Sequence, residues 1–86
     1  MPATYILRSG KDGSYYVGST RDLPGRIKKH NKGGVSSTKN KRPLQLVYTE
    51  QYKTYAEANR REKQIKGWKK RKNIERLINT APSSIG

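Results

Sequence analysis

Two short runs rich in β-forming residues flank a glycine turn near the start of the chain, and no other feature limits the fold as much. The runs are residues 4–9 and 14–19, and the turn between them reads Gly-Lys-Asp-Gly. Runs of this kind, joined by a few residues that include glycine, are the sequence signal of a β-hairpin. We therefore expect the chain to open with two antiparallel strands.

The length of the turn decides which residues of the hairpin face one another. If the loop is residues 10–13, Tyr5 faces Gly18 and Leu7 faces Tyr16, and any other loop length changes this register. Alternate residues of a strand share a face, so Tyr5 and Tyr16 become diagonal neighbours about 7–8 Å apart. Gly18 has no side chain, which leaves space opposite Tyr5 for another backbone or a phosphate.

A helix is expected after the hairpin. Asp22 is a favoured residue for capping a helix, and Pro24 is tolerated in the first turn. The residues that recur at helical spacing, and so share a face, are Leu23, Ile27 and His30. The pair Gly33-Gly34 then ends the helix.

A loop and a third strand follow the first helix. Residues 35–42 are polar and show no periodicity, which indicates a loop. Its side chains that are candidates to contact phosphates are Ser36, Ser37, Thr38 and Lys39. After Pro43, apolar and polar residues alternate as in a half-buried strand. The residues expected to share one face of this strand are Leu44, Leu46 and Tyr48.

A second helix is predicted from the capping-box pattern Thr54-x-x-Glu57, and it is expected to end at Gly67. The residues of its apolar face are Tyr55, Ala58 and Ile65. Glu62 falls on that same face, where a carboxylate is out of place unless it has a partner. This position favours a metal-binding role for Glu62. The alternative is a structural ion pair, for which the candidate partners are Arg61, Lys66 and Arg26.

These elements predict an α+β fold, a small three-stranded antiparallel sheet flanked by helices. A short closing helix is expected around Ile74, Leu77 and Ile78. With 86 residues, of which 30% are hydrophobic, the chain has enough material for one modest core. We expect a single domain over residues 1–80 and a disordered tail at 81–86.

The absence of cysteine and of long apolar runs limits the cellular compartments in which we expect the protein. Without Cys there is no disulfide framework and no Cys-ligated zinc site, which suits a reducing compartment. No apolar run reaches the length of a membrane span or of a signal-peptide core. We expect a soluble, cytoplasmic protein without a membrane partner.

The charge of the chain points to a polyanionic partner. Lys and Arg number 20 against 6 Asp and Glu, a net charge of +14. Small soluble domains usually carry about 2–8 charges, and a field this strong favours phosphate chains. Acidic proteins and anionic lipids are the weaker alternatives. The densest basic run is residues 60–72, and its proposed nucleic-acid contacts are Arg60, Arg61, Lys66, Lys69 and Lys70.

The hairpin strings resemble the elements that name a nuclease superfamily. Thr4-Tyr5-Ile6 and Tyr16-Val17-Gly18 are similar to the GIY and YIG elements of the GIY-YIG nucleases. The likeness extends over residues 4–78 and is strongest to the small stand-alone bacterial members. It includes Ser19-Thr20 with Leu23, Arg26, His30 and Asn31, similar to the first helix of that family, and residues 58–62 with Ile65-Lys66, similar to its acidic helix. The glycine of the first element is absent, and Val17 replaces the isoleucine of the second.

The resemblance implies metal-assisted hydrolysis of a DNA phosphodiester. It implies that Tyr5 acts as base towards the attacking water and that Tyr16 positions that water and the scissile phosphate. Arg26 matches the arginine that binds the phosphate. His30 is one helical turn beyond Arg26 on the same face. Glu62 matches the carboxylate that holds a divalent ion, Mg²⁺ or Mn²⁺.

Three functions remain open from the sequence. The first is an active, Mg²⁺-dependent DNA endonuclease of the DNA repair type, selective for DNA structure rather than sequence because no recognition module is attached. The second is a non-catalytic nucleic-acid-binding module on the same scaffold. The third is an RNA-binding protein. Oligomeric state is not determined by any of these patterns.

Overall fold

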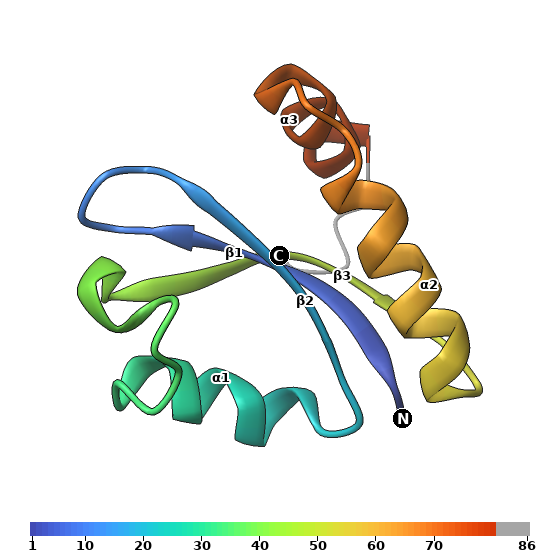
Figure 1. Cartoon of the computed structure of the whole chain (residues 1–86), viewed down its shortest axis with the longest axis horizontal. Helices are drawn as coiled ribbons and strands as arrows, with labels where there is room; N and C mark the ends of the chain where they lie inside the picture. Colours follow the sequence, from blue (N-terminus) through green and yellow to red (C-terminus); the bar gives the residue numbers. More distant parts are fainter. Residues whose placement is uncertain (81–86) are drawn as a thin grey trace.

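A three-stranded antiparallel sheet forms the centre of the computed structural model, which describes residues 1–80. Its strands are β1 (Ala3–Ser9), β2 (Tyr15–Thr20) and β3 (Leu44–Gln51), in the order β2-β1-β3. Figure 1 shows helix α1 on one side of the sheet and helices α2 and α3 on the other. This is the predicted fold class. The tail expected at residues 81–86 lies outside the described residues.

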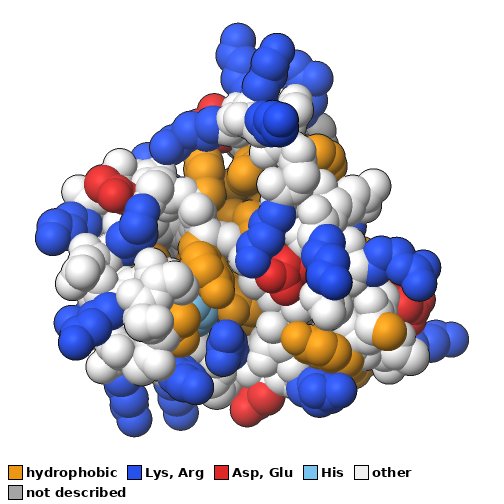
Figure 2. Space-filling view, viewed as in Figure 1, with side chains coloured by type: hydrophobic (Ala, Val, Ile, Leu, Met, Phe, Trp, Pro, Cys, Tyr) orange, Lys and Arg blue, Asp and Glu red, His pale blue; other side chains and the backbone are white. Residues whose placement is uncertain are grey.

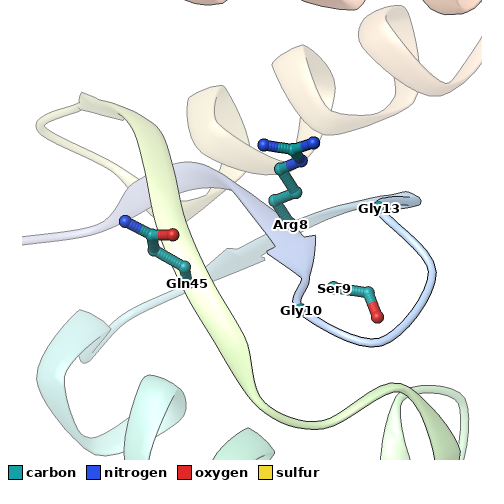
Figure 3. Close-up of a pocket in the computed structure, with 5 residues that line it drawn as sticks. All are labelled: Arg8, Ser9, Gly10, Gly13 and Gln45. Atoms are coloured by element: carbon teal, nitrogen blue, oxygen red, sulfur yellow. The ribbon is translucent and has the colours of Figure 1, made fainter.

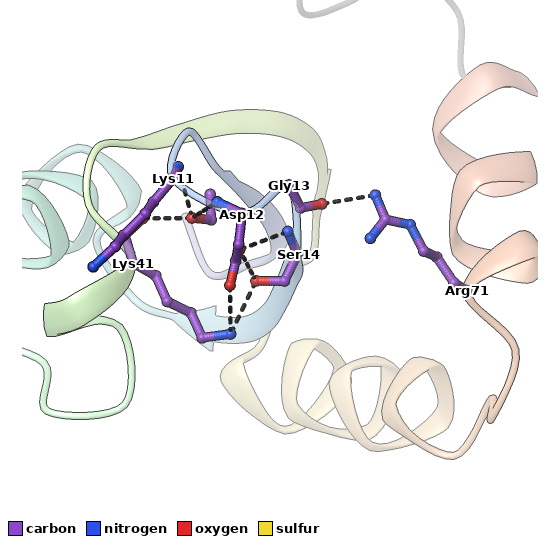
Figure 4. Close-up of polar contacts among 7 residues, drawn as sticks. Lys11, Asp12, Gly13, Ser14, Lys41 and Arg71 are labelled. Carbon is purple, nitrogen blue, oxygen red and sulfur yellow. Dashed lines mark hydrogen bonds and ion pairs between the residues drawn. The ribbon is translucent and has the colours of Figure 1, made fainter.

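The hairpin has the predicted register, with Tyr5 opposite Gly18 and Leu7 opposite Tyr16. Its turn is held by side chains, as Figure 4 shows. Asp12 Oδ1 accepts hydrogen bonds from the backbone N–H and the hydroxyl of Ser14, at 2.9 and 2.7 Å. These two bonds hold the pKa of Asp12 well below its ordinary value. The turn therefore has a fixed length, and the pairing of the tyrosines follows from it.

Helix α1 (Leu23–Asn31) has a side-chain cap at its start and a side-chain link to β3 at its end. The carboxylate of Asp22 caps its start by accepting a hydrogen bond from the Gly25 N–H. At the other end, the Asn31 amide exchanges two hydrogen bonds with the backbone of Leu44, at 2.8 and 3.1 Å. Gly33 then turns the chain with a φ of 81°. The helix is thus fixed directly to β3.

The third strand departs from the expected alternation. Between Ile6 and Leu7 the register of β1 against β3 shifts by one residue, so Tyr48 pairs with Ile6 while Leu46 pairs with Leu7. Such a β-bulge sends the side chains beyond it to the other face. Leu44 and Leu46 therefore pack with Tyr5, whereas Tyr48 packs with Ile6 on the α2 side. The prediction that all three apolar residues share a face was wrong.

Helix α2 (Tyr55–Lys66) has the predicted capping box, with Thr54 and Glu57 bonded to each other's backbone. Its buried residues are Ala58 and Ile65, which fix the face that packs on β1 and β2. Helix α3 (Arg71–Thr80) follows, and Arg71 attaches it to the hairpin. One guanidinium N–H of Arg71 donates to the Gly13 carbonyl at 2.7 Å (Figure 4), and the guanidinium lies 4.6 Å from the Tyr15 ring centroid.

The two faces of the sheet carry separate cores. On the α1 side the core is Tyr5, Leu7 and Leu44, with Tyr16, Leu23, Ile27 and Leu46 packed against it. On the α2 side it is Ile6, Val17, Tyr48 and Ile65. Within residues 1–80, no helix is long and apolar enough to cross a membrane.

A carboxylate on β3 ties the sheet to α2. Glu50 accepts hydrogen bonds from the hydroxyls of Tyr48 and Tyr52. It also forms an ion pair with Arg61, whose Nε lies 3.0 Å from Glu50 Oε1. Burial, together with bonding to Glu50, raises the pKa of both tyrosines to about 12. Because its oxygens are bonded within the fold, Glu50 serves structure rather than chemistry.

Candidate active site

The candidate site lies at the free edge of β2, between α1 and α2. Figure 2 shows hydrophobic side chains in the middle of this face, with Lys and Arg on both sides over the two helices. A hollow beside it is lined by Ser19, Thr20, Arg21, Asp22, Arg26 and Tyr55. Apolar surface between two basic rims suits an extended phosphate chain with exposed bases or sugars.

Tyr5 occupies the space that the sequence left open above Gly18. The side chain of Tyr5 is fully buried on the α1 face. A Cβ added to Gly18 would lie 2.5 Å from the Tyr5 hydroxyl oxygen, far inside contact distance. The space that we expected to admit a backbone or phosphate is therefore filled by the phenol itself. Gly18 is needed so that this phenol can lie across β2 and contact His30 and Arg26.

Tyr5, Tyr16 and His30 form a cluster of three rings. The ring centroids of the two tyrosines are 6.3 Å apart, which agrees with their expected diagonal placement. The imidazole of His30 packs edge-on against both, at 5.8 Å from Tyr5 and 5.0 Å from Tyr16. The hairpin register predicted that Tyr5 and Tyr16 are neighbours, and His30 was grouped with them only through the family resemblance.

The His30 imidazole is fully buried and bonded through both nitrogens. Nε2 lies 3.0 Å from the Tyr5 hydroxyl, and Nδ1 lies 2.7 Å from the hydroxyl of Thr38. Burial lowers the pKa of His30 below its ordinary 6.5, and the nearby charges of Arg26 and Lys29 lower it further. At neutral pH the imidazole is therefore uncharged and has one nitrogen able to accept a proton.

Thr38 does not have the role that the sequence suggested. It lies at the end of the loop that precedes a short 3₁₀ helix, η1 (Lys39–Lys41), and it is fully buried. Its hydroxyl faces His30 and not the solvent. Thr38 is thus unavailable to a phosphate, whereas Ser36, Ser37 and Lys39 are exposed as expected. A polar loop without periodicity gave no indication of this burial.

Arg26 brings a permanent positive charge to the same cluster. Its Nε donates to the Tyr5 hydroxyl at 3.4 Å. This contact raises the pKa of Arg26, and burial raises the pKa of Tyr5, so both keep their protons at neutral pH. Two guanidinium nitrogens remain to bind an anion. Arg26, Tyr5 and His30 therefore form one hydrogen-bonded chain from the surface to the core.

Glu62 approaches the edge of β2 from the opposite face of the sheet. The Ser19 hydroxyl donates to Glu62 Oε1 at 2.5 Å, and the Lys66 ammonium lies 2.6 Å from Oε2. Lys66 Nζ is also 5.8 Å from the centroid of the Tyr16 ring, so it spans the gap between the two groups. Of the ion-pair partners considered for Glu62, Lys66 is the one that pairs, while Arg61 binds Glu50.

The surroundings of Glu62 fit one hard divalent ion that is held jointly with a substrate. Among residues 1–80, no group of three or more His, Cys, Asp or Glu side chains forms a closed metal cage. Mg²⁺ binds through one or two carboxylates and completes its shell with water and phosphate oxygens. The Lys66 ammonium pairs with Oε2, so an ion bound at that oxygen would have to displace it. Glu62 is therefore the residue that could hold such an ion, with waters and a substrate phosphate completing its shell.

Most of the remaining predicted nucleic-acid contacts are exposed to solvent. Lys39, Arg60, Lys69 and Lys70 are exposed, and Lys66 is half-exposed beside Glu62. Arg61 is only partly exposed and its guanidinium is held by Glu50. A second hollow lies at the turn end of the hairpin (Figure 3), where Arg8 projects from β1 between Gln45 and Gly13. Arg8 has no ion pair within the described part of the chain and adds another exposed positive charge.

Two residues of the site escaped sequence reasoning. Ser19 was part of the family likeness, but nothing indicated that its hydroxyl would hold Glu62. Ser19 is two residues from Val17 on β2 and therefore shares the α2 face with it. Its pairing with Glu62 could have been predicted once α2 was assigned to that face. Thr38 carried no such signal, because its contact with His30 depends on the path of an irregular loop.

Comparison with known proteins shows the family and the fold to which this chain is similar. The model of the GIY-YIG catalytic domain matches residues 1–75. UPF0213 proteins of Staphylococcus aureus strains Mu3 and N315 are each 45% identical over 75 residues, covering 86% of this chain and 89% of the relative. The solution NMR structure of a UPF0213 protein from Bacillus halodurans matches with a TM-score of 0.59 and 40% identity, covering 92% of this chain and 84% of that one. A nuclease-type phosphodiesterase acting on nucleic acid is what this domain implies, and the chain belongs to the GIY-YIG family.

Proposed function

We propose that the protein is a divalent-metal-dependent endonuclease that hydrolyses DNA phosphodiester bonds. The observation that carries the proposal is the meeting of two half-sites at the edge of β2. Tyr5, Arg26 and His30 supply proton transfer and phosphate binding from the α1 face. Glu62 supplies a carboxylate from the α2 face. Phosphodiester hydrolysis needs both functions within reach of one phosphate.

The hydrogen-bonded chain gives a path for the proton of the attacking water. The Tyr5 hydroxyl oxygen takes that proton while its own proton passes to His30 Nε2, 3.0 Å away. The water oxygen bonds to phosphorus as the bond to the leaving oxygen breaks. Because the phenol is never left as a free anion, its raised pKa does not prevent it from acting as base. Tyr16 lies beside both groups and orients the water.

The negative charge that grows on the phosphate is met from two sides. Arg26 has two guanidinium nitrogens free of the Tyr5 contact to bind the non-bridging oxygens. Glu62 would hold the Mg²⁺ or Mn²⁺ ion, which when bound neutralises charge on the leaving oxygen. Ser19 fixes the orientation of the Glu62 carboxylate.

The substrate that we propose is DNA whose structure, rather than sequence, is recognised, as in repair and recombination. The exposed charges at the site bind phosphates, which carry no sequence information. RNA has the same phosphates and is a possible partner for the same surface. The rival function is a binding module without turnover, which uses the charge but not the proton path.

Cleavage assays test the proposal directly. The wild-type protein and Glu62→Gln are incubated with single-stranded, duplex, flap and branched DNA, and with matched RNA, in Mg²⁺, Mn²⁺ or EDTA. We expect metal-dependent scission that falls by at least about 100-fold in Glu62→Gln, with little change in DNA affinity. Lys66→Met removes the ammonium that competes for Oε2 and is expected to lower the metal concentration at half-maximal rate.

Glu75→Gln is the matched control, because Glu75 pairs with Arg71 on α3. It is expected to cut DNA at the wild-type rate. Tight binding to DNA with no scission by the wild-type protein under any metal condition would favour the binding module.

A further inference from the structure

Thr38 is the one fully buried side chain of the loop that connects α1 to β3, and it faces the proposed proton path. Its hydroxyl oxygen lies 2.7 Å from His30 Nδ1 and 3.4 Å from the carbonyl oxygen of Val35. The Thr38 N–H also donates to that carbonyl, at 3.1 Å. The loop therefore closes on itself and presents the hydroxyl oxygen to the imidazole.

The number of protons available decides how these groups are bonded. A threonine hydroxyl has one proton, and a carbonyl oxygen accepts but does not donate. When Thr38 donates to Val35, its oxygen is left as an acceptor, so Nδ1 of His30 must carry the ring proton. The neutral imidazole then has a bare Nε2, which accepts the hydroxyl proton of Tyr5.

The opposite arrangement would disable the path. If Thr38 donated to Nδ1, the ring proton would sit on Nε2 and point at the Tyr5 oxygen. That oxygen already faces the Nε–H of Arg26 at 3.4 Å. With two donors aimed at it, the phenol oxygen would have no lone pair left to take a proton from water, and His30 would have no site to receive one.

We propose that Thr38 is a positioning residue of the active site, which holds the ring proton of His30 on Nδ1 and so keeps Nε2 free to accept the proton of Tyr5. The part of this inference that concerns turnover rests on the proposed nuclease function. Thr38 touches no substrate, and it acts only through His30. The arrangement is a hydroxyl-imidazole-phenol chain in which the third member sets the tautomer of the second.

The tautomer can be measured without any substrate. His30 is the only histidine in the chain, so its two ring nitrogens give unambiguous signals in a ¹⁵N NMR spectrum. In the wild-type protein we expect a protonated Nδ1 and a bare Nε2 at neutral pH. In Thr38→Val, which keeps the shape and removes the hydroxyl, we expect this preference to be lost. Thr38→Ser is expected to restore it.

Turnover is the second readout. The partner of an imidazole that fixes its orientation typically contributes about 10-fold to 100-fold to activity, so kcat is expected to fall by that factor in Thr38→Val and to recover in Thr38→Ser. KM is expected to stay unchanged, because Thr38 is fully buried. The control is Thr4→Val, because Thr4 is also fully buried and donates to the Ala58 carbonyl at 2.7 Å without touching His30. It is expected to change neither the tautomer nor kcat.

The two readouts separate this inference from the proposed function. A bare Nδ1 in the wild-type protein, or a Thr38→Val variant with unchanged tautomer and unchanged kcat, would overturn the role of Thr38. The wild-type spectrum alone can do so even if Thr38→Val does not fold. If the tautomer shifts in Thr38→Val but the wild-type protein cleaves no nucleic acid, the positioning of His30 by Thr38 is supported and the nuclease function is rejected.

Discussion

At the scale of single residues, the candidate site depends on a histidine that the fold keeps uncharged. His30 is fully buried, and the aromatic and charged groups around it are Tyr5, Tyr16, Arg26 and Lys29. Desolvation and the two positive charges all act against imidazolium. An uncharged imidazole is what proton acceptance from a phenol requires. The burial of His30 in the core therefore also keeps its imidazole in the form that can accept a proton.

This burial predicts how stability depends on pH. The pKa of His30 is lowered in the folded state, so between 6.5 and that lower value the unfolded chain binds a proton that the folded chain does not. Stability is therefore full above 6.5 and falls as the pH decreases through this window. We expect the free energy of unfolding, measured in urea, to decline between neutral pH and about 5, and His30→Gln to remove most of that slope.

Glu50 is the comparison group for the pH dependence of stability that we attribute to His30. The pKa of Glu50 is lowered by hydrogen bonds from Tyr48, Tyr52 and Arg61, although burial alone would raise it. Its contribution is present above its ordinary 4.5 and is lost only at lower pH. Glu50→Gln is therefore expected to leave the slope near pH 6 intact. An unchanged slope in His30→Gln would show that the imidazole is not the titrating group.

At the scale of elements, the sequence was informative wherever a short local pattern fixed the geometry. The Gly-Lys-Asp-Gly turn set the register that places Tyr5 beside Tyr16, and the capping box set the start of α2 and therefore the face on which Glu62 lies. Both are contacts among neighbouring residues, so they can be inferred without knowledge of the tertiary structure.

The elements that could not be inferred depend on contacts between distant segments. The bulge in β3 is invisible in a strand whose residues alternate regularly, because it arises from pairing with β1. The burial of Thr38 results from the packing of a loop against α1. The space over Gly18 was recognised, but its occupant was not, since a rotamer of Tyr5 decides it.

The β1–β2 pair yields a prediction about Gly18. In Gly18→Ala the new Cβ would lie 2.5 Å from the Tyr5 hydroxyl oxygen, so the phenol must move away from His30 and Arg26. A displacement of about 1 Å in a catalytic group costs about 100-fold in rate, and overpacking costs about 1–3 kcal/mol of stability. We expect kcat to fall by about this factor while the protein still folds, as judged by circular dichroism and urea unfolding.

Gly67→Ala is the control for the added methyl group. Gly67 follows α2 with a φ of −71°, and a Cβ there would approach only the carbonyl oxygens of Gln64 and Lys63, at 3.3 and 3.5 Å. Cleavage is expected to persist in this variant. Full activity in Gly18→Ala would mean that the position of the Tyr5 phenol is unimportant for the reaction.

At the scale of the whole molecule, the net charge of +14 is expected to set the salt dependence of DNA binding. Each phosphate neutralised on duplex DNA adds about 0.9 to the slope of log affinity against log salt concentration. Lys69 and Lys70 are exposed between α2 and α3, and Arg60 is exposed on α2. We therefore expect these charges to contribute to DNA affinity and not to kcat.

The triple variant Arg60→Gln, Lys69→Gln, Lys70→Gln tests this division. We expect the salt slope of DNA binding, measured by fluorescence anisotropy, to decrease by up to about 2.7, and kcat at saturating DNA to stay near the wild-type value. Lys53→Gln, an exposed lysine in the turn after β3, is the charge control and is expected to change the slope much less. An equal change in slope per charge removed in the two variants would indicate that only net charge matters.

The division of the site between two faces of an edge strand has a consequence for how the protein is made. Tyr5, Tyr16, Arg26 and His30 are translated before β3, whereas Glu62 arrives on α2 near the end of the described chain. A ribosome that stops before α2 releases a product that contains the residues of the proposed proton path and lacks the carboxylate of Glu62. Such a truncated product lacks half of the site, so under the proposed function only complete, folded copies would cut DNA.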